Sequence, residues 1–220
     1  MARIARVVAE HYPHHITQRG NRRQNTFFCD DDYRYYIQLM AEWCGKYSVT
    51  IWAYCLMPNH VHLIAVPESE DGLRRAIGEA HRRYTRHINF REEWKGHLWQ
   101  GRFSSFLMDK KYLLTATRYI ELNPVRAGLV SIPEKYPWSS VKAHIKGKDD
   151  ALVRAKPLLT MVDDWHLFLS QTVSNEEYTL LQRHERTGRP LGSKRLVKRL
   201  ETKLSRILTP QKGGRPKKEQ

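Results

Sequence analysis

The order of the predicted elements indicates an α+β fold, a ferredoxin-like antiparallel sheet with helices packed on one face. Alternating apolar residues mark short strands, and apolar residues spaced three and four apart mark the helices between them. Their order along the chain is strand, helix, strand, strand, helix, strand, helix. A tight turn joins the two middle strands into a hairpin, and the whole order is typical of a split βαβ unit. A basic helical extension follows.

The first half of the chain supplies three strands and a helix. Asp30 is a residue that favours the start of a helix, and the apolar positions from Tyr33 to Cys44 recur with helical spacing. Met57-Pro58-Asn59 forms the turn between two strands, because Pro and Asn favour turn conformations. The expected strands are 12–18, 49–56 and 60–66, and the expected helix is 30–46.

The second half begins with a helix that opens at Asp71-Gly72. Leu98–Met108 contains a short strand, and Asp109 caps a third helix that runs through Leu122 and stops before Pro124. The helical spacing of apolar residues is lost around 146–150 and returns at 175–185 and 193–208. We therefore expect a main domain (1–147), a connecting segment (148–174) and a basic extension (175–220) with a polar, disordered tail.

The charge balance indicates a polyanionic partner. The formal net charge is +15, and residues 186–220 alone carry twelve Lys and Arg against two Glu, a net charge of +10. No run of eighteen apolar residues occurs, so we expect no membrane-spanning helix. The first residues lack the apolar core of a secretory signal, and the three cysteines have no C-x-x-C spacing. These features favour a cytoplasmic protein.

His60-Val61-His62 is the strongest chemical signal in the sequence. Side chains alternate along a strand, so the two imidazoles project from the same face, with Cα atoms about 7 Å apart. Histidine is the commonest side-chain metal ligand. A His-x-His pair alone is a weak signal, and a solvent-facing strand with two incidental histidines is the competing interpretation.

Three stretches together resemble the REP-associated tyrosine transposases, a family within the HUH single-strand transposase and nuclease superfamily (IS200-like). They are His15-Ile16-Thr17-Gln18-Arg19-Gly20-Asn21, then Met57–Ile64, then Tyr112-Leu113-Leu114 followed by residues 119–128. The resemblance covers roughly residues 12–130. Three ordered motifs at compatible separations are far more specific than any one of them.

The resemblance implies cleavage and rejoining of single-stranded or hairpin DNA. His60 and His62 would hold Mg²⁺ or Mn²⁺ against the scissile phosphate, and Tyr112 would attack the phosphorus to leave a 5′-phosphotyrosine. Imperfect palindromes such as repetitive extragenic elements are the expected targets, and the protein would be associated with the nucleoid. Relatives include homodimers and monomers, so the oligomeric state stays open.

Two parts of this assignment have competitors. Tyr112 lies in the first turn of the expected helix, and Tyr119 on the same helix is its main rival. Relatives often place a polar ligand one helical turn beyond the tyrosine, but here that position is Ala116. Thr115, water or another segment would supply the third ligand, and imidazole pairs suit Mn²⁺, Zn²⁺ or Ni²⁺ better than Mg²⁺.

Basic and polar side chains in several segments are candidates for contact with DNA. At most one of His14 and His15 faces the site, with a structural or DNA-contacting role. Gly188-Arg189-Pro190 partly matches a minor-groove hook. The candidate DNA-binding residues are Arg19, Asn21, Arg82, Arg83, Arg86, Arg102, Arg189, Lys194, Arg195, Lys198, Arg199 and Arg215.

Two other functions compete with the transposase. A domesticated protein would bind hairpin DNA with little or no transposition, and Ala116 is the feature that favours it. A metal-dependent hydrolase of RNA or nucleotides would use the histidines without a covalent step. The hydrolase leaves the tyrosine helix and the basic tail without a role, so we rank it last.

Overall fold

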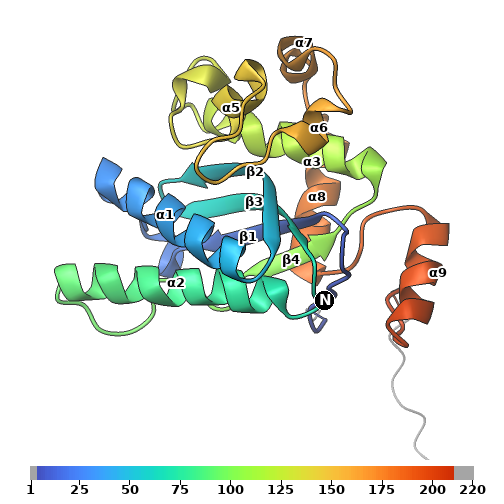
Figure 1. The fold of residues 1–220 in the computed structure, drawn as a ribbon, viewed down its shortest axis with the longest axis horizontal. Helices are drawn as coiled ribbons and strands as arrows, with labels where there is room; N and C mark the ends of the chain where they lie inside the picture. The colour runs from blue at the N-terminus through green and yellow to red at the C-terminus, as the bar shows by residue number, and fades with distance from the viewer. Residues whose placement is uncertain (1–3, 211–220) are drawn as a thin grey trace, which may run out of the picture.

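The computed structural model describes residues 4–210, and a four-stranded antiparallel sheet lies at its centre (Figure 1). The order across the sheet is β2-β3-β1-β4, so β1 and β3 are the central strands. This order and the antiparallel pairing confirm the predicted ferredoxin-like α+β class. The strands are β1 (His14–Arg19), β2 (Val49–Met57), β3 (His60–Pro67) and β4 (Ser104–Leu107).

Helices α1 (Asp30–Lys46) and α2 (Gly72–Arg91) pack side by side on one face of the sheet (Figure 1). Their apolar sides form one core with the strand residues that point toward them, including Ile16, Val61 and Leu63. Both helices lie where their sequence periodicity predicts them. This layer is the predicted one.

The opposite face of the sheet is covered as well, by a layer that the sequence did not predict (Figure 1). The reason lies in the strands, because Ala53, Cys55, Ile64 and Phe106 alternate onto this second face and need apolar cover. The elements of this half are α3 (Lys110–Glu121), α4 (Asn123–Arg126), α5 (Val141–Lys146), α6 (Lys156–Leu159), α7 (Trp165–Ser170) and α8 (Asn175–Thr187). Short 3₁₀ turns occur at η1 (Asn21–Arg23) and η2 (Pro133–Lys135).

A buried polar cluster holds this second layer together. The carboxylate of Glu121 accepts hydrogen bonds from Ser140 Oγ at 2.6 Å and Trp165 Nε1 at 2.9 Å, and it lies 2.6 Å from His144 Nδ1. Residues 148–174 therefore contribute to the core, with Leu158, Trp165 and other apolar side chains packed beneath α3. The division of the chain at 147 and 174 stays a prediction.

The last helix, α9 (Lys194–Lys203), packs on the N-terminal segment rather than extending into solvent. Its apolar stripe, Leu196 and Leu200, shares a small core with Val7, Ala9 and Leu107. The helix is shorter than the predicted 193–208. None of the helices in residues 4–210 is long and apolar enough to cross a membrane.

Candidate active site

The histidine pair lies on the face of the sheet that α3 and α8 cover. Residues that alternate with Val61 and Leu63 on β3 point to this face, which places His60 and His62 there. On the neighbouring strand β1, His15 and Thr17 share the same face, and Thr17 lies directly opposite His62. Three imidazoles therefore meet on two central strands.

Hydrogen bonds orient the rings. His60 Nδ1 lies 2.6 Å from Asn59 Oδ1, an acceptor, so this nitrogen carries the proton and Nε2 keeps its lone pair. His62 Nδ1 lies 3.0 Å from His15 Nε2 and 3.3 Å from Thr17 Oγ1. The ring of His62 lies 4.9 Å from that of His60 and 5.2 Å from that of His15.

The electrostatics keep these imidazoles neutral. Burial, with the Arg19 charge, lowers the pKa of His60 to about 3, and burial alone lowers the pKa of His15 to about 3. The pKa of His62 falls well below its usual value, mainly through burial, and also because a charge on His62 would be repelled by a charged His60 or His15 and by Arg19. A neutral imidazole presents a lone pair, which is the form that binds a metal ion.

The site fits a divalent metal ion in part. His62 Nε2 is buried without a hydrogen-bond partner in the described chain, and a metal ion would supply that partner. Over residues 4–210, however, no three His, Cys, Asp or Glu side chains converge as a metal site. His60 and His62 are the two side chains here that would hold such an ion.

Tyr119 of α3 is the tyrosine that contacts the histidines. Its ring centroid lies 5.5 Å from that of His62 and 6.0 Å from that of His15, both edge to face. Helix α3 starts beside the end of β4 and runs back over the sheet, so its third turn reaches the histidines. The side chain of Tyr119 is 8% exposed.

The structure does not bring Tyr112, the tyrosine favoured by the sequence, to the histidines. Tyr112 precedes Tyr119 by seven residues, or about 10 Å along the helix axis. It lies in the first turn, where its backbone N–H donates to the capping carboxylate of Asp109. In the described part of the chain, no ring contact joins Tyr112 to His60 or His62.

Helix α8 supplies a second tyrosine over the first. Tyr178 lies 5.3 Å from Tyr119, ring to ring, and shares a hydrogen bond with its hydroxyl. The guanidinium of Arg126 lies 3.5 Å from the centre of the Tyr178 ring. Burial raises the pKa of Tyr119 above its usual value, Glu185 and Tyr178 add to the rise, and the Arg126 charge opposes it.

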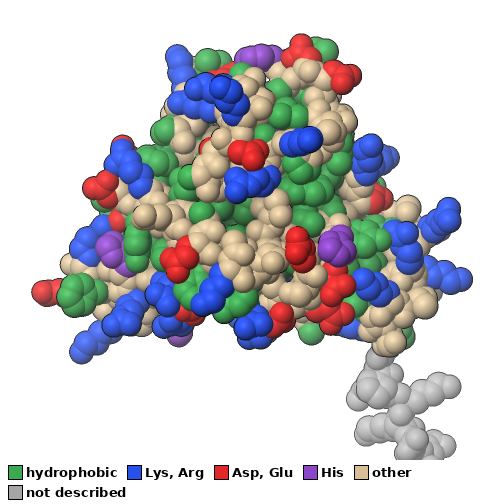
Figure 2. Space-filling view, in the orientation of Figure 1, with side chains coloured by type: hydrophobic (Ala, Val, Ile, Leu, Met, Phe, Trp, Pro, Cys, Tyr) green, Lys and Arg blue, Asp and Glu red, His purple; other side chains and the backbone are tan. Residues whose placement is uncertain are grey.

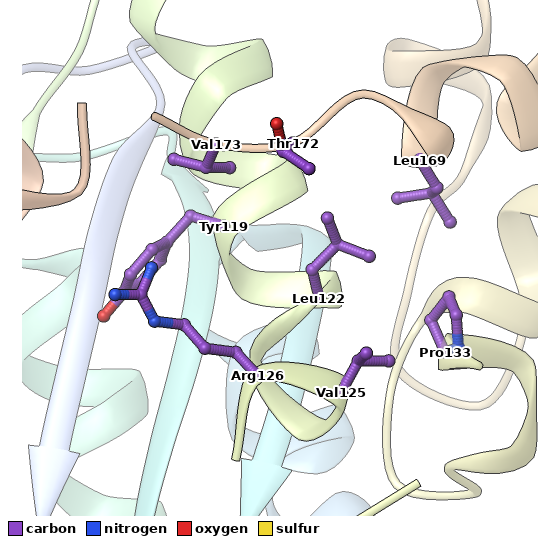
Figure 3. A pocket seen from close by; sticks show the side chains of 8 residues that line it. All are labelled: Tyr119, Leu122, Val125, Arg126, Pro133, Leu169, Thr172 and Val173. Carbon is purple, nitrogen blue, oxygen red and sulfur yellow. The ribbon is translucent and has the colours of Figure 1, made fainter. Parts of the chain in front are cut away.

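A cavity of about 400 Å³ opens beside Tyr119 and Arg126 (Figure 3). The two side chains lie together at one end, and Leu122, Val125, Pro133, Leu169, Thr172 and Val173 surround the rest, as Figure 3 shows. None of the three histidines lines it. The cavity therefore lies to the side of the histidine cluster.

The position one helical turn beyond Tyr119 is Asn123. Leu122 keeps a right-handed helical conformation between α3 and α4, its N–H bonds to the Arg118 carbonyl and its carbonyl accepts from Arg126 N, so Asn123 lies about one turn after Tyr119. Ala116 is fully buried and apolar, and Thr115 Oγ1 points to Glu177 of α8 at 3.5 Å. Neither of the two residues named from the sequence faces the histidines.

Among the candidate DNA-binding residues, only Arg19 joins the histidine cluster. It pairs with His60 across the sheet, and its charge contributes to the lowered pKa values of His60 and His62. Asn21 lies just beyond, in the 3₁₀ turn η1. Arg102 is exposed in the segment before β4.

The remaining basic residues fall in two other places. Arg82, Arg83 and Arg86 lie on α2, on the other side of the sheet, and the first two pair with Glu79. Lys194, Arg195, Lys198 and Arg199 lie exposed on α9. Arg189 donates a hydrogen bond to the Leu208 carbonyl within the fold, and Arg215 lies outside the described residues.

The sequence of this chain matches the model of one protein family. It is described as "Transposase IS200 like" and matches residues 8–123, more than half of the chain. The chain belongs to the IS200-like transposase family. The matched range contains β1 to β4, both histidines and Tyr119, whereas Arg126 and Tyr178 lie outside it.

One curated protein and one solved structure are similar to the IS200-like chain. A Haemophilus influenzae protein named "Putative REP-associated tyrosine transposase" is 29% identical over 116 residues, which span 48% of this chain and 66% of that protein. A REP-associated tyrosine transposase, solved bound to a REP hairpin, shares the fold with a TM-score of 0.58. It is 21% identical, and the match covers 69% of this chain and 90% of that one.

Several site residues escaped the sequence-based assignment. The sequence expected at most one of His14 and His15 to face the site, and the pairing of β1 with β3 places His15 there, together with Thr17, beside His62. Tyr178 comes from α8, outside the family match. A usable signal existed for Asn123, because it lies four residues after Tyr119 just as Ala116 lies four after Tyr112.

Proposed function

We propose that this IS200-like transposase cuts and rejoins hairpin DNA through a covalent 5′-phosphotyrosine on Tyr119. The observation that carries the proposal is the packing of the Tyr119 ring against His62 and His15 on a shared face of the sheet. Tyr112 was the nucleophile expected from the sequence. We assign the role to Tyr119 because it alone of the two contacts the histidines.

The chemistry follows from these groups. The Tyr119 hydroxyl gives up its proton and its oxygen attacks the phosphorus, the bond from phosphorus to the 3′ oxygen breaks, and the leaving 3′ oxygen takes up a proton to become a 3′ hydroxyl. The phosphodiester energy is conserved in the phosphotyrosine, so a second 3′ hydroxyl can reverse the step without ATP. A divalent ion would withdraw charge from the phosphate, and His60, His62 and Asn123 would hold it.

The raised pKa of Tyr119 indicates what such an ion would contribute. A buried phenol with a raised pKa is protonated at neutral pH and is a poor nucleophile. Arg126 is the nearby cation that opposes this rise. We propose that Arg126 also attracts the scissile phosphate, since a guanidinium binds phosphate oxygens with two parallel hydrogen bonds.

A hairpin-binding protein without cleavage is the second candidate. The observation that favours it is the cover over Tyr119, whose side chain lies beneath Tyr178 and is 8% exposed. A covalent adduct with DNA separates the two functions, because binding alone forms none and is indifferent to chelators.

The test compares Tyr119→Phe with Tyr112→Phe. Each variant is incubated with Mn²⁺ and an end-labelled hairpin that carries single-stranded arms, and the adduct is detected on a denaturing gel. We expect the adduct with the wild type and with Tyr112→Phe, and none with Tyr119→Phe or with a chelator. An adduct formed by Tyr119→Phe and lost in Tyr112→Phe would return the role to Tyr112.

A further inference from the structure

A cleft of about 500 Å³ lies at the other end of α3, away from Tyr119. Its walls come from the segment before β1, the middle of β2, the first turn of α3 and helix α9. Tyr12, Trp52, Lys110, Arg195 and Arg199 are among the side chains that line it. Two of these five residues belong to α9, which lies outside the family match.

The cleft carries cations that no acidic side chain neutralises. In residues 4–210 no ion pair joins Lys110, Arg195 or Arg199 to a carboxylate. The carboxylate of Asp109 lines the cleft, but it accepts hydrogen bonds from the backbone N–H groups of Tyr112 at 3.2 Å and Ser193 at 2.9 Å. Lys and Arg side chains project from the end of the molecule where α9 lies (Figure 2).

Two aromatic rings face the same space. Trp52 occupies an irregularity in β2, where the register with β3 shifts between Ile51 and Ala53. Such a bulge turns a side chain away from the position that regular alternation gives it, and bulges are frequent beside functional sites. The ring of Tyr12 lies nearby, and its hydroxyl accepts a hydrogen bond from Arg199.

Helix α9 is fixed in place as one wall of the cleft. Leu196 and Leu200 are buried against the N-terminal segment, and Arg206 donates to the Ala5 carbonyl at 2.8 Å. Lys203 pairs with Glu10 at 3.7 Å. A helix anchored in this way presents its cations at fixed positions, unlike a flexible basic tether.

We propose that this cleft seats a single-stranded DNA arm that leads to the scissile phosphate. A base would stack on Trp52, and the flanking phosphates would contact Lys110 and Arg195, the combination of stacking platform and cationic groove that single strands favour. Lys110 and Tyr119 are nine residues apart on one helix, about 13 Å, so the arm spans a few nucleotides. The inference rests on the proposed function only in taking DNA as the substrate.

The test is a binding measurement on two probes, a blunt DNA hairpin and the same hairpin with a single-stranded arm of thymidines on its 5′ or 3′ side. All chains carry Tyr119→Phe and the buffer contains a chelator, so no cleavage intervenes. The cleft variant is Lys110→Glu with Arg195→Glu. The matched control is Lys111→Glu with Lys198→Glu, which changes the charge equally on the same two helices but outside the cleft.

We expect the parent chain to bind the armed hairpin more tightly than the blunt one. In the cleft variant this ratio of affinities should be about tenfold smaller. Its salt slope for the armed probe should fall by about 1.4, for two lost phosphate contacts on a single strand. The control variant should bind both the blunt and the armed probe more weakly than the parent chain, by the same small factor. Trp52→Leu, which keeps an apolar side chain, should bind a thymidine arm and an abasic arm equally.

Equal effects of the cleft and control variants on the armed probe would overturn the proposal, as would an arm that never improves binding on either side. These binding results do not test which tyrosine is the nucleophile, since they involve no cleavage. Conversely, absence of the covalent adduct would refute the proposed function and leave the cleft measurement intact. Tighter binding of an acidic peptide than of the arm would also overturn it.

Discussion

Asn123 is the residue that would complete the proposed metal site. It follows Tyr119 by four residues along a helical backbone that continues through Leu122. An amide oxygen is an acceptable ligand for Mn²⁺ or Mg²⁺, and it explains why no third acidic or histidine ligand converges on the pair in residues 4–210. The assignment can be tested without catalysis.

The Asn123→Ala variant should bind Mn²⁺ about tenfold more weakly or worse, measured by titration calorimetry, with its folding unchanged. Thr115→Ala serves as the control, because that hydroxyl faces Glu177 and not the histidines. Weaker Mn²⁺ binding by Thr115→Ala than by Asn123→Ala would contradict the assignment.

A second prediction concerns the ion pair between the buried carboxylate of Asp32 and Arg91, whose side chain is 34% exposed. Burial raises the pKa of the Asp32 carboxyl, but hydrogen bonds from Arg91 and from the N–H groups of Phe28 and Cys29 outweigh it, so the pKa is lowered. A lowered pKa contributes stability that is present above the unfolded pKa of about 3.9 and is lost as the pH falls through the folded value.

Arg91→Ala leaves this carboxylate buried with only its backbone donors, so we expect a loss of about 3 kcal/mol in the free energy of unfolding at pH 7. The measurement is urea unfolding at pH 7 and at pH 3. The difference in the free energy of unfolding between wild type and variant should be smaller at pH 3, where the carboxyl of the variant is protonated. A difference that is constant with pH would exclude this origin.

Residue spacing alone could not predict whether Tyr112 or Tyr119 contacts the histidines. Seven residues are nearly two helical turns, so both tyrosines lie on the same side of α3 and share one periodicity. Only the placement of the helix over the sheet decides which ring meets His62. By contrast, His60 and His62 could be predicted, because strand alternation fixes their common face from sequence alone.

At the scale of elements, α8 is the helix that covers Tyr119, and its start depends on Ser174. Ser174 and Glu177 form a capping box, in which the Ser174 hydroxyl accepts from Glu177 N at 3.2 Å and the Glu177 carboxylate accepts from Ser174 N at 2.9 Å. Loss of this cap would loosen the first turns, which carry Tyr178.

The Ser174→Ala variant should therefore lose about 1 kcal/mol of stability and be cut faster by trypsin at Arg183 and Arg186. Ser193→Ala removes the corresponding cap from α9, where the Ser193 hydroxyl accepts from Leu196 N. It should leave the cleavage rate within α8 unchanged. Equal acceleration by both variants would indicate a general loss of stability instead.

The elements that the sequence predicted well are those with strong periodicity. The hairpin of β2 and β3 and the helices α1, α2 and α3 repeat their apolar residues over whole strands or several turns. Helices α5, α6 and α7 have six residues or fewer, too short to show a period. Glu121 is the buried acceptor that holds two of these short helices, α5 and α7, to α3.

For the whole molecule, the net charge of +15 makes binding to DNA dependent on salt. If about six phosphates are neutralised, affinity for a hairpin should fall about 10³-fold between 50 and 200 mM salt. Fluorescence anisotropy across this range measures the slope. An affinity that hardly changes with salt would show that contacts with the bases, and not with the phosphates, dominate.

The position of β3 inside the sheet sets how long the candidate metal site persists. Strand β3 is hydrogen-bonded to β1 along one edge and to β2 along the other, and Val61, Leu63 and Ala65 are fully buried. Backbone amides in such a strand exchange with solvent only when the whole sheet opens. The two histidines therefore keep their spacing for as long as the protein stays folded, and any loosening of the helices above them changes access to the site without dismantling it.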